Sequence, residues 1–341
     1  MAHPASTVGV KTQHRYLRVQ DLLRLQHLAF TCQKRIEGQY VGHHASPQRG
    51  QSVEFNDYRK YTSGDEVTKI DWKVYGRSDK LFVKRFEHHN DLTVNLLVDA
   101  SASMDYRGIH VGQELPEGGS GDEDDSGLRP LATQSPKGPT AQDRQLVDHP
   151  SKFEQACFIA AAIAFLVTKQ QDRIGFGIAQ NGLRHFHRPQ ATSRHLNKLL
   201  GTMERVRPRQ RADLAESLRA LALRTSRKGL LVVISDLLED VDDIMRALTL
   251  FKHRGNKVIL FQVLHADELH LPHLANAVFV DSETGRRLPL NVADVTPAYE
   301  EHLKTFLRGW TDTCRNRGID HNLVSTATAY HDALQQYLTG R

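Results

Sequence analysis

Residues 91–106 read DLTVNLLVDASASMDY, and this stretch decides the fold. Its first half is a nearly continuous apolar run made by Leu92, Val94, Leu96, Leu97 and Val98. Such a run is expected of a strand in a parallel sheet whose two faces are both covered. The polar residues that follow, beginning with Asp99, would then lie beyond the carboxyl end of the strand, where open α/β sheets bind their ligands.

Apolar strands and helical segments alternate along the rest of the chain. The pattern predicts strands over 173–179, 229–235, 257–264 and 322–325. It predicts helices over 153–168, 193–203, 213–223, 241–251, 297–317 and 332–338. This alternation indicates an α/β fold with an open, doubly wound, mainly parallel sheet that carries helices on both faces.

The region before residue 91 has a different pattern of residues. Short apolar segments and many turn formers between 38 and 87 predict a small β-rich N-terminal module. We expect a flexible N-terminus over 1–17, a helix over 19–28 that belongs with the module at 18–90, and the sheet domain over 91–341. Residues 107–150 hold eight acidic and four basic residues among many Gly, Pro and Ser, so we predict a disordered acidic insertion there.

Composition narrows the classes of function and location. The net formal charge is +5, and the insertion contributes −4, so the rest of the 341-residue chain carries +9. No nucleic-acid motif accompanies this charge, and we expect no nucleic-acid partner. No apolar run reaches about 18 residues, and the N-terminus lacks the apolar core of a secretory signal. We therefore expect no membrane span and a cytoplasmic location.

The strongest functional signal is a set of oxygen-bearing side chains at predicted strand ends. Asp99, Ser101 and Ser103 are spaced by two residues, so their side chains can converge on one side of a turning segment. Asp236 directly follows the strand predicted over 229–235, in the position that matches Asp99. Asp213 precedes a predicted helix and is either a further ligand or the helix N-cap, of which we favour the cap. Carboxylates and hydroxyls are hard ligands, so we predict a site for Mg2+, or for Mn2+ or Ca2+.

The motif at 99–103, DASAS, resembles the DxSxS signature of the metal-ion-dependent adhesion site in von Willebrand factor A domains. The ISD at 234–236 is similar to the third metal loop of that fold. In that family the second loop usually supplies a threonine ahead of Asp or Asn and a helix, whereas this chain has Ala212, followed by Asp213. The resemblance therefore implies a site that is weaker, that uses Asp213 through a water, or that is empty.

Residues 35–264 resemble the signature of the bacterial domain of unknown function 58 family, whose members join such an N-terminal segment to an A-type domain. The matching residues before the sheet domain are Gly42, Ser46, Gly50, Glu54, Phe55, Arg59, Tyr61, Gly64, Asp65, Ile70, Asp71, Trp72, Arg77, Leu81, Lys84 and Phe86. Their charges suit a structural network, with Trp72 and Phe86 packed inside the module. Alternatively, Arg59, Asp71 and Arg77 face a partner.

The resemblance implies a non-enzymatic adaptor that works with a MoxR-type AAA+ ATPase in the assembly or maturation of other proteins. The chain has no phosphate-binding loop of its own, so another chain would supply the ATPase. A cation with an open coordination position would accept an acidic residue of a protein partner. Two alternatives remain: a metal-dependent hydrolase acting on phosphoesters, and a basic nucleic-acid-binding protein.

Overall fold

The computed structural model describes residues 14–18, 24, 53–62, 70–78, 80–88, 92–108, 149–225, 228–272 and 276–339. The chain forms two compact units, one over Thr31–Leu92 and the other over Met1–Phe30 together with Thr93–Arg341. Most of the helix expected over 19–28 and most of the insertion expected over 107–150 lie outside the described residues.

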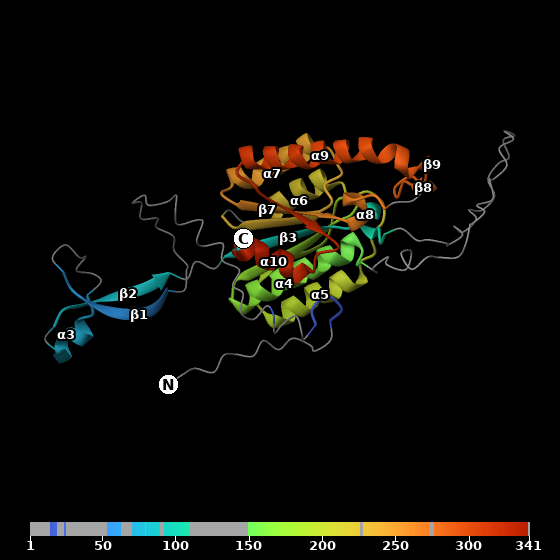
Figure 1. The fold of residues 1–341 in the computed structure, drawn as a ribbon. Helices are drawn as coiled ribbons and strands as arrows, with labels where there is room; N and C mark the ends of the chain where they lie inside the picture. The colour runs from blue at the N-terminus through green and yellow to red at the C-terminus, as the bar shows by residue number, and fades with distance from the viewer. Residues whose placement is uncertain are drawn as a thin grey trace, which may run out of the picture. The chain divides into compact units, whose positions relative to one another are not determined.

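The larger unit is built on a six-stranded sheet in the order β10-β7-β6-β3-β4-β5 (Figure 1). The strands are β3 (Thr93–Asp99), β4 (Arg173–Ala179), β5 (Leu183–Gln190), β6 (Leu230–Ser235), β7 (Lys257–Leu264) and β10 (Asp320–Ser325). Neighbouring strands run parallel, except that β5 pairs antiparallel with β4 at the edge of the sheet. The predicted open, mainly parallel sheet is therefore confirmed. The polar edge strand β5 is an addition that the alternation of strands and helices did not predict.

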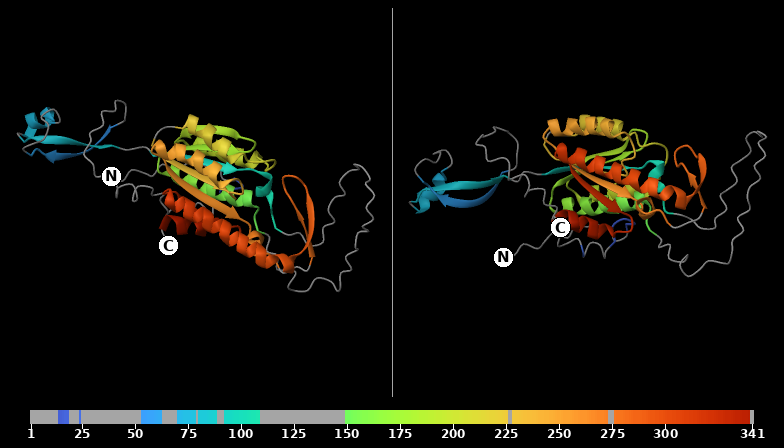
Figure 2. Two further views of the ribbon diagram at one scale, coloured as in Figure 1. Left: turned by 90° about the horizontal axis from the view of Figure 1, so that it is seen from above. Right: turned by 45° about the horizontal axis from the view of Figure 1, so that its top comes forward.

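Helices cover both faces of this sheet, as further views show (Figure 2). They are α4 (Lys152–Lys169), α5 (Ser193–Arg205), α6 (Leu214–Arg224), α7 (Val241–His253), α9 (Val292–Asn316) and α10 (Tyr330–Thr339), with the short η2 (Ala102–Asp105) and α8 (Ala266–Leu269). On one face α6, α7 and α9 close a core in which Leu97, Leu231 and Leu260 of the sheet share a cluster with Trp310. Within the described part of the chain, no helix combines the length and apolar character needed to cross a membrane.

Helix α4 passes beneath the middle of the sheet and is buried along almost its whole length. A capping box fixes where it begins: Ser151 Oγ accepts from the Glu154 backbone N–H at 3.1 Å, and the Ser151 N–H donates to Glu154 Oε2 at 3.1 Å. Arg15 and Arg107 both pair with the same Glu154 carboxylate. The first turn of α4, including Lys152, is therefore held in place from several sides.

Two features after β7 differ from the expectation. A hairpin of β8 (Asn276–Val280) and β9 (Arg287–Asn291) was not predicted. Helix α9 begins at Val292, five residues before the predicted start at Pro297. Proline favours the first turn of a helix, which placed the predicted start too late. The true N-cap is Asn291, whose Oδ1 accepts from the Ala293 N–H at 3.1 Å.

The smaller unit pairs β1 (Val53–Lys60) antiparallel with β2 (Phe82–His88), with α3 (Trp72–Ser78) between them in the chain. The small β-rich module is confirmed. One expectation for it is wrong, because Trp72 is 58% exposed and lies edge-to-face on Tyr75 rather than packed inside.

Residues 14–17, the last of the segment expected to be flexible, pack against other parts of the larger unit. Tyr16 and Leu17 are buried, and His14 Nδ1 lies 3.1 Å from a carboxylate oxygen of Glu204. Tyr16 meets Phe158 of α4 edge-to-face. Residues 14–17 are thus held against α4 and α5.

Candidate functional site

Four of the predicted ligands meet at the carboxyl edge of the sheet. Asp99 ends β3, Ser101 is the N-cap of η2, Ser103 lies within η2, and Asp236 directly follows β6. Strands β3 and β6 are parallel neighbours, with Val98 opposite Ile234. The ends of the two strands therefore lie side by side, which brings together residues more than 130 positions apart.

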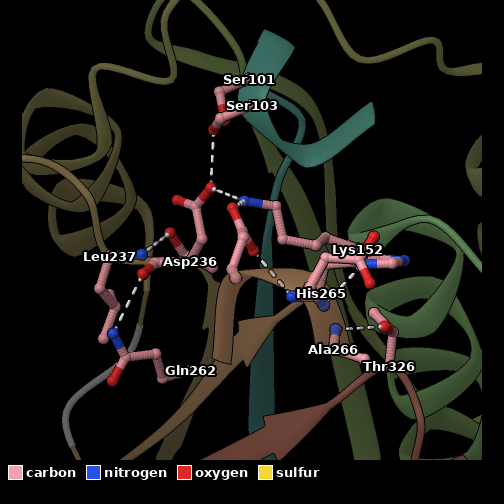
Figure 3. A network of polar contacts seen from close by, with 12 residues as sticks. Ser101, Ser103, Lys152, Asp236, Leu237, Gln262, His265, Ala266 and Thr326 are labelled. Carbon is pink, nitrogen blue, oxygen red and sulfur yellow. Dashed lines mark hydrogen bonds and ion pairs between the residues drawn. The ribbon is translucent and has the colours of Figure 1, made fainter. Parts of the chain in front are cut away.

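Hydrogen bonds link these side chains, and Figure 3 shows the part of the network around Ser103 and Asp236. Ser103 Oγ donates to Asp236 Oδ2 at 2.7 Å, and the hydroxyls of Ser101 and Ser103 are 3.0 Å apart. Asp99 Oδ1 accepts from the Ser101 N–H at 2.8 Å, and Asp99 Oδ2 accepts from Ser235 Oγ at 2.6 Å. Each carboxylate is thus oriented by groups that belong to its own or the adjacent strand end.

A buried lysine completes the network from the opposite side. Lys152, in the first turn of α4, is 0% exposed, and its Nζ donates to Asp236 Oδ2 at 2.9 Å and to Glu268 Oε1 of α8 at 2.7 Å. Burial by itself lowers the pKa of Lys152, but the two carboxylates outweigh burial and leave that pKa raised. The ammonium therefore stays charged and compensates part of the negative charge of the site.

The ionised form of Asp99 is disfavoured by its surroundings. Burial and then the nearby carboxylate of Asp236 raise the pKa of Asp99 to about 7, although the hydrogen bonds from Ser235 and Ser101 act in the opposite direction. A buried carboxylate whose ionised form lacks a counter-charge is typical of functional sites rather than of structural ion pairs.

The backbone after Asp236 is held in an uncommon conformation. Leu237 has φ 58°, in the left-handed region that a leucine rarely adopts. Its N–H donates to Ser235 Oγ at 3.0 Å, and Gln262 Nε2 donates to the Asp236 carbonyl at 3.1 Å (Figure 3). Strain of this kind persists where surrounding contacts enforce it, and it gathers at ligand-binding loops.

Asp213 is not joined to this network by any hydrogen bond among the described residues. It stands at the N-cap position of α6 with φ 48°, yet its side chain makes no capping hydrogen bond, so the expected capping role is wrong. Glu239 takes that role, because both of its carboxylate oxygens accept from the Leu214 N–H, at 3.0 and 2.9 Å. The neighbouring Ala212 is buried in the core and offers no hydroxyl.

The three weaker candidates lie in the smaller unit. Asp71 is buried, and its Oδ1 and carbonyl accept from the N–H groups at the start of α3. This agrees with a structural role for its carboxylate. Arg77 lies exposed in the last turn of α3, and Arg59 lies in β1.

The residues at the carboxyl edge fit a hard divalent cation. Among the described residues, no three His, Cys, Asp or Glu side chains form a metal-holding group, so a cation here would need the hydroxyls of Ser101 and Ser103 as well as the carboxylates. With Asp99, Asp236 and Glu268 ionised, Lys152 leaves an excess of two negative charges, which a divalent ion would balance. Oxygen donors of this kind suit Mg2+, Mn2+ or Ca2+.

Sequence reasoning missed Lys152, Glu268 and Ser235. Only Lys152 could have been suspected from the sequence. Lys152 occupies the first turn of a largely apolar helix, where the helix dipole disfavours a cation. Such a lysine requires a carboxylate partner, although the sequence does not say which one.

The chain matches known proteins over most of its length. It is 28% identical over 265 residues to uncharacterized proteins of Mycobacterium tuberculosis and Mycobacterium bovis, a match that covers 76% of this chain and 70% of theirs. Solved structures with a similar arrangement include the conserved hypothetical protein BatB from Bacteroides thetaiotaomicron and an aerotolerance-related membrane protein from Bacteroides fragilis. Each is 12% identical over 73% of this chain, with a TM-score of 0.39, and the match covers 98% and 100% of their chains. The family model for the protein of unknown function DUF58 matches residues 57–114 and 141–305, and the chain therefore belongs to the DUF58 family.

Proposed function

We propose that this protein is a non-enzymatic adaptor that binds a protein partner at the carboxyl edge of its larger unit, in a manner that depends on a divalent cation. One observation carries the proposal. The side chains of Asp99, Ser101, Ser103 and Asp236 gather at two adjacent strand ends, where Ser103 Oγ lies 2.7 Å from Asp236 Oδ2 and 3.0 Å from Ser101 Oγ. An oxygen cluster of this kind has no role in the core packing of the sheet.

The chemistry of such a site is recognition of a carboxylate. A hard cation held there would keep open coordination positions for an acidic side chain of the partner. The protein's own groups orient the ligands: Ser235 and the Ser101 N–H fix Asp99, and Lys152 fixes Asp236. The four side chains are therefore preorganised for binding.

The similarity of DASAS and ISD to the adhesion site of von Willebrand factor A domains supports the same proposal. Ala212 takes the place of the usual threonine, so the site has one hydroxyl ligand fewer and we expect its affinity for the cation to be modest. We further propose a MoxR-type AAA+ ATPase as the partner, on the resemblance to adaptors that work with such ATPases.

The proposal predicts that Asp99→Ala will abolish cation-dependent partner binding. Binding of a purified MoxR-type ATPase from the same organism would be measured by biolayer interferometry in Mg2+ and in EDTA. We expect a loss of at least about tenfold in affinity for Asp99→Ala, equal to the loss that EDTA causes in the wild type.

Asp312→Ala is the matched control, because Asp312 is exposed in α9 near the amino end of β10, away from the candidate ligands. This variant should bind like the wild type. Affinity that survives both Asp99→Ala and EDTA would refute a role for the cation.

A further inference from the structure

Arg211 lies on a loop that is hydrogen-bonded to the chain segment carrying Ser101. Residues 206–213 connect α5 to α6 and run along the turn that carries Ser101. The Ala102 N–H donates to the Gln210 carbonyl at 2.8 Å, and the Arg209 N–H donates to the Ala100 carbonyl at 3.0 Å. Arg211 is therefore attached, through its neighbours in the chain, to the turn that supplies two of the ligands.

The loop is fixed on its other side as well. The Asn181 N–H donates to the Arg211 carbonyl at 2.8 Å, and Gln180 Nε2 donates to the Arg207 carbonyl at 2.8 Å. Gln210 is held at φ 61°, in the left-handed region. The loop backbone around Arg211 is thus held at several points, while the Arg211 side chain is 77% exposed.

The only carboxylate paired with Arg211 among the described residues comes from the β8–β9 hairpin. Glu283 Oε2 lies 3.0 Å from Arg211 Nε. Glu283 sits in the hairpin turn, where its N–H donates to Asp281 Oδ1 at 2.8 Å. An ion pair this exposed contributes little net free energy, so a competing carboxylate can replace Glu283 at small cost.

The hairpin also presents apolar side chains to solvent. Val278, Val280 and Leu288 are each about half exposed. A two-stranded hairpin gains little stability from such residues alone, and exposed apolar side chains next to a polar site are typical of protein-binding surfaces.

We propose that Arg211 anchors a second acidic side chain of the partner, and that Glu283 occupies this position in the free protein. The inference rests on the proposed function, since the first acidic side chain would be the one received at the Asp99 site. The preferred partner segment then carries two carboxylates, one for the cation and one for Arg211, and its binding moves Glu283 away from the guanidinium. A double requirement of this kind selects for paired acids over a single one.

The test uses two substitutions that break the same ion pair but are expected to act in opposite directions. An array of short synthetic peptides, each with two glutamates at a different separation, is screened in Mg2+ against full-length protein, beside matched peptides with glutamine in place of one glutamate. The best peptide is then measured by fluorescence polarisation. We expect Glu283→Gln to tighten binding about threefold, because the competitor is removed, and Arg211→Gln to weaken it about fivefold.

Two further expectations make the result specific. The double variant Arg211→Gln/Glu283→Gln should bind like Arg211→Gln alone. Once Arg211 has been replaced, removing its competitor Glu283 can no longer strengthen binding. The pair Arg315 and Asp312 in α9 is also exposed, with 74% for Arg315 and 66% for Asp312, and Arg315→Gln and Asp312→Asn should leave binding unchanged.

The outcomes separate the inference from the proposed function. If Arg211→Gln and Glu283→Gln shift the affinity in the same direction, the pair only positions the hairpin and the inference is overturned. The inference is also overturned if no two-glutamate peptide binds better than its one-glutamate counterpart. It is overturned as well if an oligonucleotide displaces the peptide from the wild type but not from Arg211→Gln. If instead Asp99→Ala binds the peptides normally, it is the proposed function that fails.

Discussion

Lys152→Met is expected to destabilise the larger unit by about 3–5 kcal/mol, the usual cost of removing one partner from a buried ion pair. The substitution keeps the length and apolar stem of the side chain but leaves Asp236 and Glu268 without the ammonium that joins them. Asp236 is almost fully buried and would then lie near Asp99 with no compensating charge. Urea denaturation followed by circular dichroism in EDTA would measure the change in the free energy of unfolding.

Two further variants test whether the loss of stability comes from the buried ion pairs of Lys152. Lys169→Met changes an exposed lysine at the other end of α4 and should cost less than about 0.5 kcal/mol. Adding Asp236→Asn to Lys152→Met should recover part of the loss, because one stranded charge is removed. A loss below about 1 kcal/mol for Lys152→Met would mean that the ammonium does not support the site.

Asp99→Asn is expected to have the opposite sign and to stabilise the cation-free protein by about 2–4 kcal/mol at pH 8. The pKa of Asp99 rises from 3.8 to about 7 in the folded protein because of burial and the Asp236 carboxylate. The folded state therefore binds a proton that the unfolded chain has already released between these two values. The stability of the wild type should fall as pH rises from about 4 to about 7 and should then level off.

Equilibrium unfolding in EDTA at pH values from 5 to 8 would test this. The wild type should lose stability over that range relative to Asp99→Asn, and the difference should be greatest at pH 8. Asp105→Asn is the control, because Asp105 is exposed at the end of η2. Its free energy of unfolding should match that of the wild type within about 0.5 kcal/mol. If Asp99→Asn is less stable than the wild type at pH 8, the carboxylate is well supported without a cation and the reasoning about its charge is wrong.

The central strands were predictable because their residues are apolar on both faces, as in β6, whose residues are all buried. The same pattern located Asp99 and Asp236, since each follows directly on such a strand. Strand β5 was not predicted, because an exposed edge strand carries polar residues, here LRHFHRPQ, and lacks an apolar pattern. Its antiparallel pairing depends on the short turn after β4, which the periodicity does not report.

The site was predictable only as far as local spacing reaches. Ser101 and Ser103 lie two and four residues from Asp99, so a motif describes them. Lys152 and Glu268 reach the site from the first turn of α4 and from α8, which only the folded chain brings together. The N-cap of α6 makes the same point, because the local rule selected Asp213, whereas Glu239, 25 residues away from Leu214, supplies the hydrogen bonds.

Isothermal titration calorimetry of Mg2+ and Mn2+ into the full-length protein tests whether the oxygen cluster at the sheet edge holds a cation. We expect one ion per chain with a dissociation constant of about 0.1–1 mM, in the range of weak oxygen-ligand sites. Asp99→Ala and Ser103→Ala should each lower this affinity at least about tenfold, and Asp312→Ala should leave it unchanged. Wild-type protein that binds neither ion at about 10 mM, or variants that bind as tightly as the wild type, would contradict the proposed cation-dependent site.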